Sequence, residues 1–225
     1  MTSLYRHLTL LLLGLLFTFN SLGCASTGIA VKEFFGQAKR EQLVDRVQDA
    51  RDEQTEAKEQ FESALAEFLA LTGADGGELE AMYERLKDEA DASEKQAEDV
   101  RKRIRDVERV ADALFAEWAG ELEEYANQDM RRASERQLSE TRMRYNEMLT
   151  AMKRAEAKME PVLAAFNDQV LFLKHNLNAR AIASLESNFA KLETDIETLV
   201  SEMEQSIREA NAFIEEMGTA DGGGP

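Results

Sequence analysis

Apolar side chains recur along the chain in steps of three and four residues, in four separate segments. This spacing places them on one side of an α-helix, so each segment predicts a helix with one apolar stripe, interrupted by a few polar positions. The first stripe comprises Leu43, Val47, Ala50, Gln54, Ala57, Phe61, Ala64, Phe68 and Leu71. The second comprises Leu79, Met82, Leu86, Ala90, Ser93, Ala97, Val100, Ile104, Val107, Ala111, Leu114, Trp118, Leu122 and Tyr125. The third comprises Leu138, Thr141, Tyr145, Met148, Met152, Ala155, Met159, Val162, Phe166 and Leu173, and the fourth Ile182, Leu185, Phe189, Leu192, Ile196, Leu199, Met203, Ile207, Ala210, Ile214 and Met217.

Breaks in this pattern mark the expected ends of the helices. The glycine-rich segment TGADGGE at residues 72–78 ends the first helix and begins the second. The pattern also fades near residue 128 and near residue 177, where the second and third turns are expected. Pro161 lies inside the third stripe, which continues in phase at Val162, so we expect a kink there rather than a helix end.

The four stripes predict an all-α fold, because a long helix with one apolar stripe is stable only when that stripe is buried. Short links and similar lengths favour a long antiparallel bundle or coiled coil of four helices, arranged up-down-up-down. We expect one such domain over residues 30–217 and a disordered tail over residues 218–225. If the chain were helical through residue 128 or residue 177, it would instead form a longer coiled-coil rod paired with a second copy.

The N-terminal stretch has the layout of a bacterial export signal. Arg6 and His7 supply a basic start, and a mostly apolar run of about a dozen residues follows, from Leu8 to Phe19. This run is short for a transmembrane helix, which needs about 20 apolar residues. Residues 1–23 are therefore predicted to be a signal peptide.

Cys24 is the only cysteine in the chain and follows this signal directly. The sequence SLGC resembles the lipobox of bacterial lipoproteins, in which the cysteine carries a diacylglycerol; Gly23 fits that pattern, whereas Ser21 and Leu22 depart from it. We therefore predict that Cys24 is lipidated and that residues 24–29 form a short linker. An ordinary cleaved signal and a retained membrane anchor are the alternatives. A reactive thiol is disfavoured, because no histidine lies near the cysteine in the sequence.

The charge of the chain excludes some classes of partner. Asp and Glu number 44 against 27 Lys and Arg, which gives a formal net charge of −17 at pH 7. Proteins that bind nucleic acid neutralise phosphates with clustered Lys and Arg, so we expect no nucleic-acid partner. Because no cysteine follows Cys24, packing rather than internal disulfides has to stabilise the domain.

Catalytic, metal and cofactor sites are not expected. His175 is the only histidine after the signal, whereas zinc and di-iron sites need several His, Cys or paired Glu-x-x-His ligands. A nucleophile would lack a positioned base for the same reason. The polar stripe positions Gln54, Ser93 and Thr141 are few and widely separated, so they do not predict a binding site in the core.

One segment departs from the acidic background. In QVLFLKHNLNAR, residues 169–180, four consecutive apolar residues precede Lys174, His175 and Arg180. If this is a helix junction, the apolar run is buried, an asparagine caps the helix, and the basic residues lie near a helix C-terminus, where the helix dipole favours them. The alternative is that Lys174, His175 and Arg180 form a contact patch for an anionic partner or a wall polymer.

Two long segments, LVDRVQDARDEQTEAKEQFESAL and MEPVLAAFNDQVLFLKHNLNARAIASL, together with the lipobox-like start, resemble a family of bacterial lipoproteins. That family is classed as a domain of unknown function and occurs mainly in gammaproteobacteria. The resemblance covers essentially the whole chain after the signal. It implies an exported, helical, lipid-anchored protein and transfers no functional residue.

We therefore expect a cell-envelope lipoprotein that contacts the membrane through a lipid on Cys24. Its bundle would act as a scaffold or interaction partner, including self-association through its coiled-coil faces. Ala25 stands where inner-membrane lipoproteins commonly carry aspartate, which favours an outer-membrane position facing the periplasm. A coiled-coil regulator of an envelope enzyme, and a ligand-binding or enzymatic bundle, are the alternatives.

Overall fold

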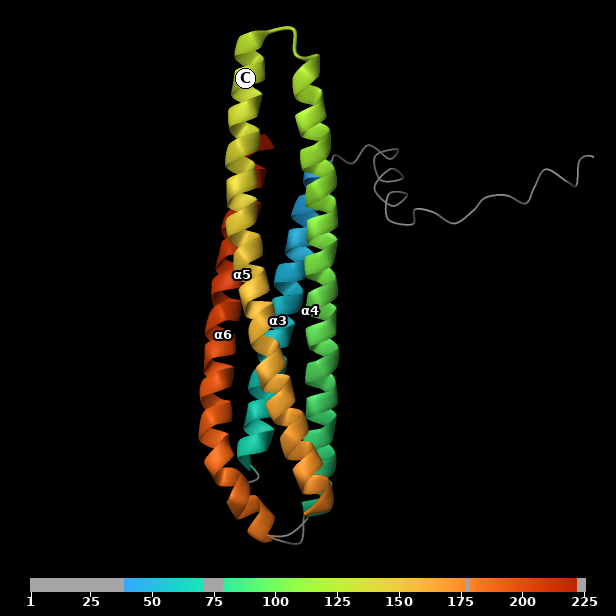
Figure 1. The fold of residues 1–225 in the computed structure, drawn as a ribbon, viewed down its shortest axis with the longest axis vertical. Coiled ribbons are helices and arrows are strands. Elements are labelled where there is room, and N and C mark those ends of the chain that lie inside the picture. Colours follow the sequence, from blue (N-terminus) through green and yellow to red (C-terminus); the bar gives the residue numbers. More distant parts are fainter. Residues whose placement is uncertain (1–38, 71–78, 177–178, 222–225) are drawn as a thin grey trace, which may run out of the picture. The chain divides into compact units, whose positions relative to one another are not determined.

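Four long helices dominate the fold (Figure 1). The computed structural model describes residues 39–70, 79–176 and 179–221, with side chains placed throughout these ranges except at residues 179–188 and 219–221. The helices are α3 (Lys39–Ala70), α4 (Leu79–Glu121), α5 (Gln128–His175) and α6 (Ala179–Asp221), and a short 3₁₀ turn, η2 (Leu122–Glu124), follows α4. The predicted all-α fold is confirmed.

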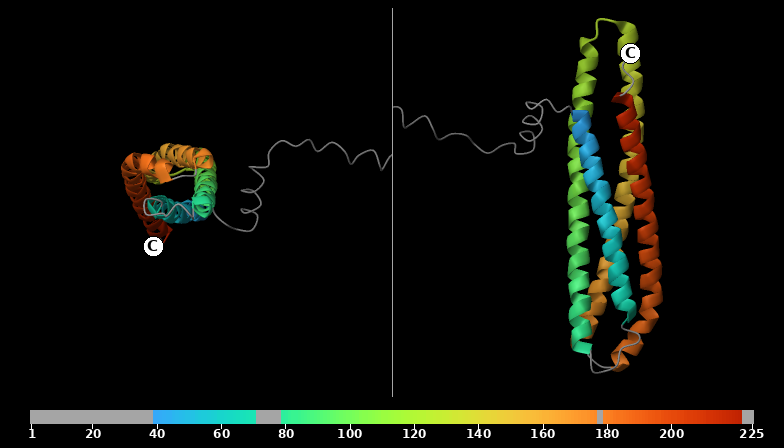
Figure 2. Two further views of the ribbon diagram at one scale, coloured as in Figure 1. Left: turned by 90° about the horizontal axis from the view of Figure 1, so that it is seen from below. Right: turned by 180° about the vertical axis from the view of Figure 1, so that it is seen from behind.

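The helices pack as an antiparallel up-down-up-down bundle. Each helix contacts the next one along the chain, and α3 also contacts α6, which closes the ring. The end-on view in Figure 2 shows the four helices at the corners of a square. This arrangement lets every helix bury its apolar stripe against two neighbours, as the sequence predicts.

The second turn forms where the apolar pattern fades near residue 128. After η2, the backbone becomes extended at Tyr125, and Asn127 caps the start of α5. The Asn127 side-chain oxygen accepts hydrogen bonds from the backbone N–H groups of Asp129, at 2.8 Å, and Met130, at 3.2 Å. A capping asparagine satisfies backbone N–H groups that have no partner within the helix, which explains why α5 begins directly after Asn127.

The third turn separates α5, which ends at His175, from α6, which begins at Ala179. The chain therefore does not continue as one coiled-coil rod, and that alternative is wrong. Between these turns, α5 runs unbroken through Pro161, whose side chain is exposed, and Figure 1 shows α5 curving along its length. Because the proline lies on the solvent side, the helix tolerates the loss of one backbone hydrogen bond.

The core follows the predicted stripes closely in the first three helices. Every described residue of the first and third stripes is buried, and so is the second stripe as far as Leu114. The second stripe then leaves the core, because Trp118 is half-buried and Tyr125 is 36% exposed. The prediction that Tyr125 is a core residue is therefore wrong, because Tyr125 follows η2 in the loop between α4 and α5.

In α6 the buried stripe departs from the prediction at two positions, while Ala210 and Met217 are buried as predicted. It follows the prediction from Phe189 to Met203, but Ser206 and Phe213 are then buried in place of Ile207 and Ile214, which are half-buried. From Phe189 to Met217 the buried residues keep strictly alternating steps of three and four, whereas the predicted stripe took two consecutive steps of four, from Leu199 to Met203 and on to Ile207. The helix also extends to Asp221, beyond the boundary predicted at residue 217.

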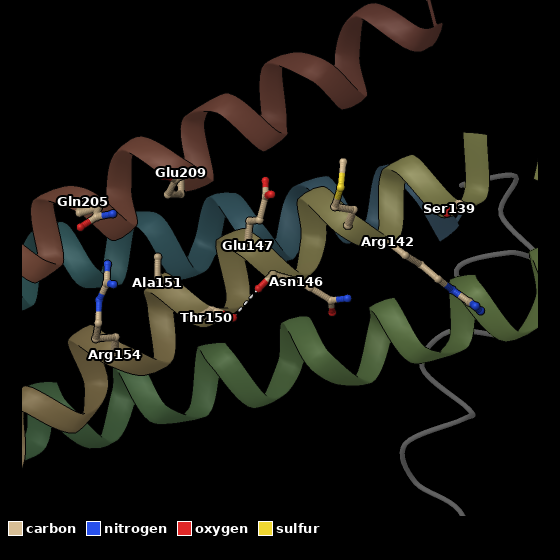
Figure 3. A pocket seen from close by; sticks show the side chains of 10 residues that line it. Ser139, Arg142, Asn146, Glu147, Thr150, Ala151, Arg154, Gln205 and Glu209 are labelled. Atoms are coloured by element: carbon tan, nitrogen blue, oxygen red, sulfur yellow. Dashed lines mark hydrogen bonds between the residues drawn. The ribbon is translucent and has the colours of Figure 1, made fainter. Parts of the chain in front are cut away.

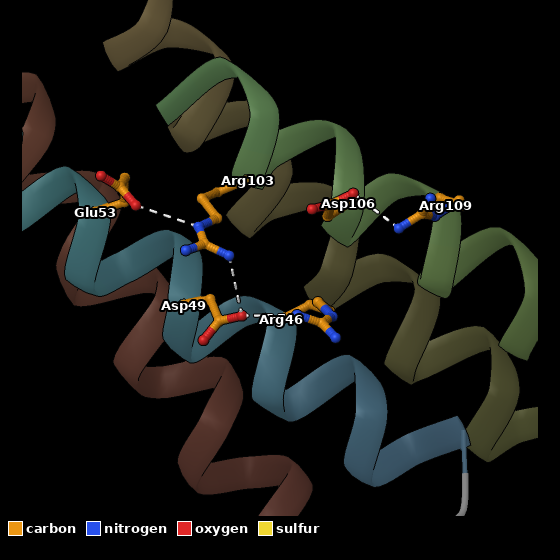
Figure 4. Close-up of polar contacts among 6 residues, drawn as sticks. All are labelled: Arg46, Asp49, Glu53, Arg103, Asp106 and Arg109. Carbon is orange, nitrogen blue, oxygen red and sulfur yellow. Dashed lines mark hydrogen bonds and ion pairs between the residues drawn. The ribbon is translucent and has the colours of Figure 1, made fainter. Parts of the chain in front are cut away.

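Ion pairs connect the outer surfaces of α3 and α4 (Figure 4). Arg103 on α4 donates a hydrogen bond to the carboxylate of Glu53 on α3, at 3.2 Å, and lies 3.5 Å from Asp49. Arg46 binds the same Asp49 oxygen at 2.9 Å. The hydrogen bond to Glu53 raises the pKa of the Arg103 guanidinium, so this group stays charged.

Candidate contact surface at the end of α5

The last turn of α5 exposes two large apolar side chains. Leu171 is 57% exposed and Phe172 is 37% exposed, whereas Leu173 is buried. The prediction that the whole run of apolar residues is buried is therefore wrong. Successive helix residues point in directions about 100° apart, so the core can receive only one or two of four consecutive side chains.

Two basic side chains lie beside them. Lys174 and His175 are both exposed, and neither side chain has an ion pair or hydrogen bond with another described residue. Both belong to the last turn of α5, where the helix dipole favours positive charge. Together, Leu171, Phe172, Lys174 and His175 form a surface that we call the α5-end cluster.

The helix end itself is capped as expected for a junction. The side-chain amide of Asn176 donates a hydrogen bond to the backbone oxygen of Phe172, at 2.9 Å, and its backbone N–H donates to that of Leu173, at 3.0 Å. Arg180 is the second residue of α6 and so lies near a helix N-terminus. Its predicted position near a helix C-terminus is wrong, and its side chain is outside the described part of the structure.

The two other basic groups of the sequence are largely neutralised by neighbouring carboxylates. In the segment 101–105, Arg105 binds Glu98 at 2.9 Å, and Arg101 reaches Glu160 on α5 at 2.9 Å. In the segment 131–136, Arg131 binds both Glu123 and Glu135, and Arg132 binds Asp129. Lys102 and Arg136 are exposed and have no such partner among the described residues. The α5-end cluster differs from these segments because its unpaired basic residues adjoin two exposed large apolar side chains.

Comparison with known protein families shows the family to which the chain belongs. Residues 29–217 match the family DUF2959, whose description is "protein of unknown function". The chain belongs to this family. No curated protein and no solved structure shows significant similarity to it. The matched range includes the α5-end cluster, so this surface is part of the DUF2959 domain.

A second candidate surface of this DUF2959 chain is an open groove of about 670 Å³ along α5 and α6 (Figure 3). It exposes Met143, which is 51% exposed, but its basic residues have partners within the bundle. The Arg142 guanidinium donates a hydrogen bond to the backbone oxygen of Phe115, at 3.0 Å, and stacks over the Phe115 ring. Arg154 forms an ion pair with Glu202 at 2.6 Å. An anionic partner would therefore have to displace existing contacts here.

The polar stripe residues do not meet in a common site. Gln54 is paired with Ser206, and the Ser93 hydroxyl donates to the backbone oxygen of Glu89, at 2.8 Å. Thr141 lines a separate pocket of about 240 Å³ together with Phe213. Each residue thus lies in its own surroundings, as their wide spacing in the sequence predicts.

The described helices and the turn between α4 and α5 contain neither a metal-binding cluster nor a membrane-spanning helix. In this part of the chain, no group of three or more His, Cys, Asp or Glu side chains is arranged to hold a metal ion. None of the described helices combines the length and apolarity that crossing a bilayer requires. Cys24, the predicted lipidation site, lies outside the described residues.

Proposed function

We propose that this DUF2959 protein is a lipoprotein of the gammaproteobacterial cell envelope whose helical bundle acts as a scaffold or protein-interaction module. A lipid on Cys24 anchors it, in the outer membrane and facing the periplasm. The signal-like residues 1–23, the lipobox-like SLGC and Ala25 support this position. The bundle would contact its partner through the α5-end cluster.

The main support for an interaction role is that the basic residues of the α5-end cluster have no partner among the described residues. Burial of an exposed apolar pair is favourable, and basic groups without intramolecular partners can pair with anionic groups of a partner without breaking existing contacts. Most arginines of the segments 101–105 and 131–136 pair with carboxylates at the protein surface, whereas Lys102 and Arg136 are exposed without such a partner among the described residues. The α5-end cluster is set apart because it combines unpaired basic groups with two exposed large apolar side chains.

The dimensions of the bundle suit a spacer. Lys39, the first residue of α3, pairs with Glu117 near the end of α4, at 2.9 Å, so the chain enters the bundle toward the α4–α5 turn. With 32 residues, α3 runs for about 48 Å toward the end that carries the α5-end cluster. The bundle thus separates its point of entry from the proposed contact surface.

Site-specific photo-crosslinking in intact cells tests this proposal. A photoreactive amino acid is placed at Leu171 in one variant and at Met143 in a matched control, because these side chains are similarly exposed, at 57% and 51%. We expect a defined protein adduct from position 171 and little or none from position 143.

Adducts from position 143 alone would favour the α5–α6 groove as the contact surface, in the manner of a coiled-coil regulator of an envelope enzyme. The absence of any adduct from position 171 would contradict the proposed role of the α5-end cluster.

A further inference from the structure

The opposite end of the bundle carries a second exposed apolar pair. Tyr125, in the α4–α5 turn, is 36% exposed, and Met130, in the first turn of α5, is 57% exposed. Figure 1 shows this turn at one end of the bundle and the C-terminal end of α5 at the other. The two exposed apolar pairs thus lie at opposite ends of the same bundle.

The charges around the two pairs have opposite sign. At the α4–α5 turn, Arg131 and Arg132 are bound by acidic neighbours. Glu121 and Glu124 are exposed, and neither forms an ion pair with another residue in the ranges that the structure describes. This end therefore has unpaired carboxylates beside its apolar pair, whereas the α5-end cluster has unpaired basic groups beside its own.

We propose that the α5-end cluster binds the α4–α5 turn of a second copy of this chain, so that two bundles associate end to end. This inference rests on the proposed role of the α5-end cluster as a contact surface, but it does not depend on the lipid. Leu171 and Phe172 would pack against Tyr125 and Met130 of the second copy. Lys174 and His175 would approach the carboxylates of Glu121 and Glu124 of that copy.

The local arrangement of groups argues for a second copy over a bilayer surface. An anionic membrane and a second copy would both repel a chain whose net charge is −17, but a membrane presents its anionic headgroups uniformly. The α4–α5 turn instead presents a local carboxylate group together with apolar side chains of matching extent. Because the two contact surfaces differ, each association leaves one free surface of each kind, so the contact can continue into an open row of bundles.

The contact is expected to be weak in dilute solution, because two apolar side chains on each partner make a small interface. It is also expected to weaken with salt, since its charges are exposed.

Sedimentation velocity of the purified, detergent-solubilised full chain tests the inference. We expect the average mass to rise with protein concentration at low salt, and to rise less at high salt. Reversing charge at either end, by Lys174→Glu with His175→Glu or by Glu121→Lys with Glu124→Lys, should weaken self-association at least tenfold. Combining all four substitutions in one chain should restore association, because the two ends are then complementary again.

Circular dichroism of each variant shows whether it remains folded, as expected for exposed positions. A wild-type chain that stays monomeric at all concentrations and salt conditions would overturn the inference, and so would a fourfold variant that associates no better than its parents.

The crosslinking experiment distinguishes a failure of the self-association inference from a failure of the proposed interaction role. An adduct from position 171 to a different protein would disprove self-association yet support an interaction role. An adduct to lipid would contradict both.

Discussion

The hydroxyl of Ser206 on α6 donates a hydrogen bond to the side-chain oxygen of Gln54 on α3, at 2.7 Å, with both side chains fully buried. The two residues join the first and last helices of the described bundle. Because the bond forms in only one alignment of these helices, it specifies their register in a seam that is otherwise mostly apolar. The side-chain nitrogen of Gln54 is buried without a hydrogen-bond partner, so the amide already depends on this single bond.

Removing the Ser206 hydroxyl is therefore expected to destabilise the bundle. Ser206→Ala leaves the Gln54 amide buried without its partner, which should lower the free energy of unfolding by about 1–3 kcal/mol in urea titrations. The double variant Gln54→Leu with Ser206→Ala replaces both polar groups and should be more stable than Ser206→Ala alone. A double variant that is less stable than Ser206→Ala would show that the hydrogen bond is not the reason for the effect.

Part of the core arrangement could be predicted from spacing, and part could not. The first and third stripes needed only the rule that residues three and four apart share a helix face. The burial of Ser206 in α6 was missed because Ile207 is more apolar and hydropathy assigned it to the core, although continued steps of three and four would have placed Ser206 there. Inside the bundle the Ser206 hydroxyl is satisfied by its hydrogen bond to Gln54 on α3, a partner that hydropathy along α6 does not reveal.

The α5-end cluster shows the same limit at the surface. The sequence predicted a junction with an asparagine cap near residue 177, and Asn176 provides that cap. It could not show which of four consecutive apolar residues would be exposed, because that depends on how the other helices pack against the end of α5. It also could not show that Lys174 lacks an ion pair, since Arg101 and Arg103 find partners on other helices.

Phe61 should be a major contributor to stability. Its side chain is fully buried, and its ring lies 6.2 Å from that of Phe166, which also stacks on Phe68 at 4.7 Å. Phe61→Ala removes a large side chain from a packed core and should lower the free energy of unfolding by about 3–5 kcal/mol. Met130→Ala, at an exposed position, serves as the control and should change it by less than about 0.5 kcal/mol. Equal effects of the two substitutions would contradict the assigned stripe.

Tyr145 should make the bundle sensitive to high pH. Its burial, together with nearby Glu108 and Asp112, raises the pKa of its hydroxyl. Below about pH 10 the hydroxyl is protonated in both states, so its contribution is fully present; above that pH the unfolded chain ionises first. Stability should therefore fall as pH rises, by up to about 1.4 kcal/mol for each pH unit.

Chemical unfolding between pH 9 and 11.5 measures this slope. Tyr145→Phe should show a shallower decline than the wild type, whereas Tyr125→Phe, at an exposed position, should not. Lysine deprotonation affects all three proteins alike, so the difference between the variants isolates Tyr145. Identical slopes for the wild type and Tyr145→Phe would contradict the effect of burial on this hydroxyl.

Cys24→Ser tests the proposed anchor. If a lipid on Cys24 is the attachment to the membrane, the variant should move from the membrane to the periplasmic fraction, because one acylation site is lost. Fractionation of cells followed by an alkaline wash measures this, with the wild type as the control. Continued sedimentation of the variant with membranes after the wash would argue for a retained anchor.

The most direct test of the account replaces the basic groups of the α5-end cluster, by Lys174→Gln with His175→Gln, in the variant that carries the photoreactive residue at Leu171. Because both side chains are exposed, the melting temperature should change by no more than the small loss of helix-dipole stabilisation. Crosslinking from position 171 should nevertheless be lost. Unchanged crosslinking together with a clearly lower melting temperature would contradict the account, because the two residues would then serve only to end the helix.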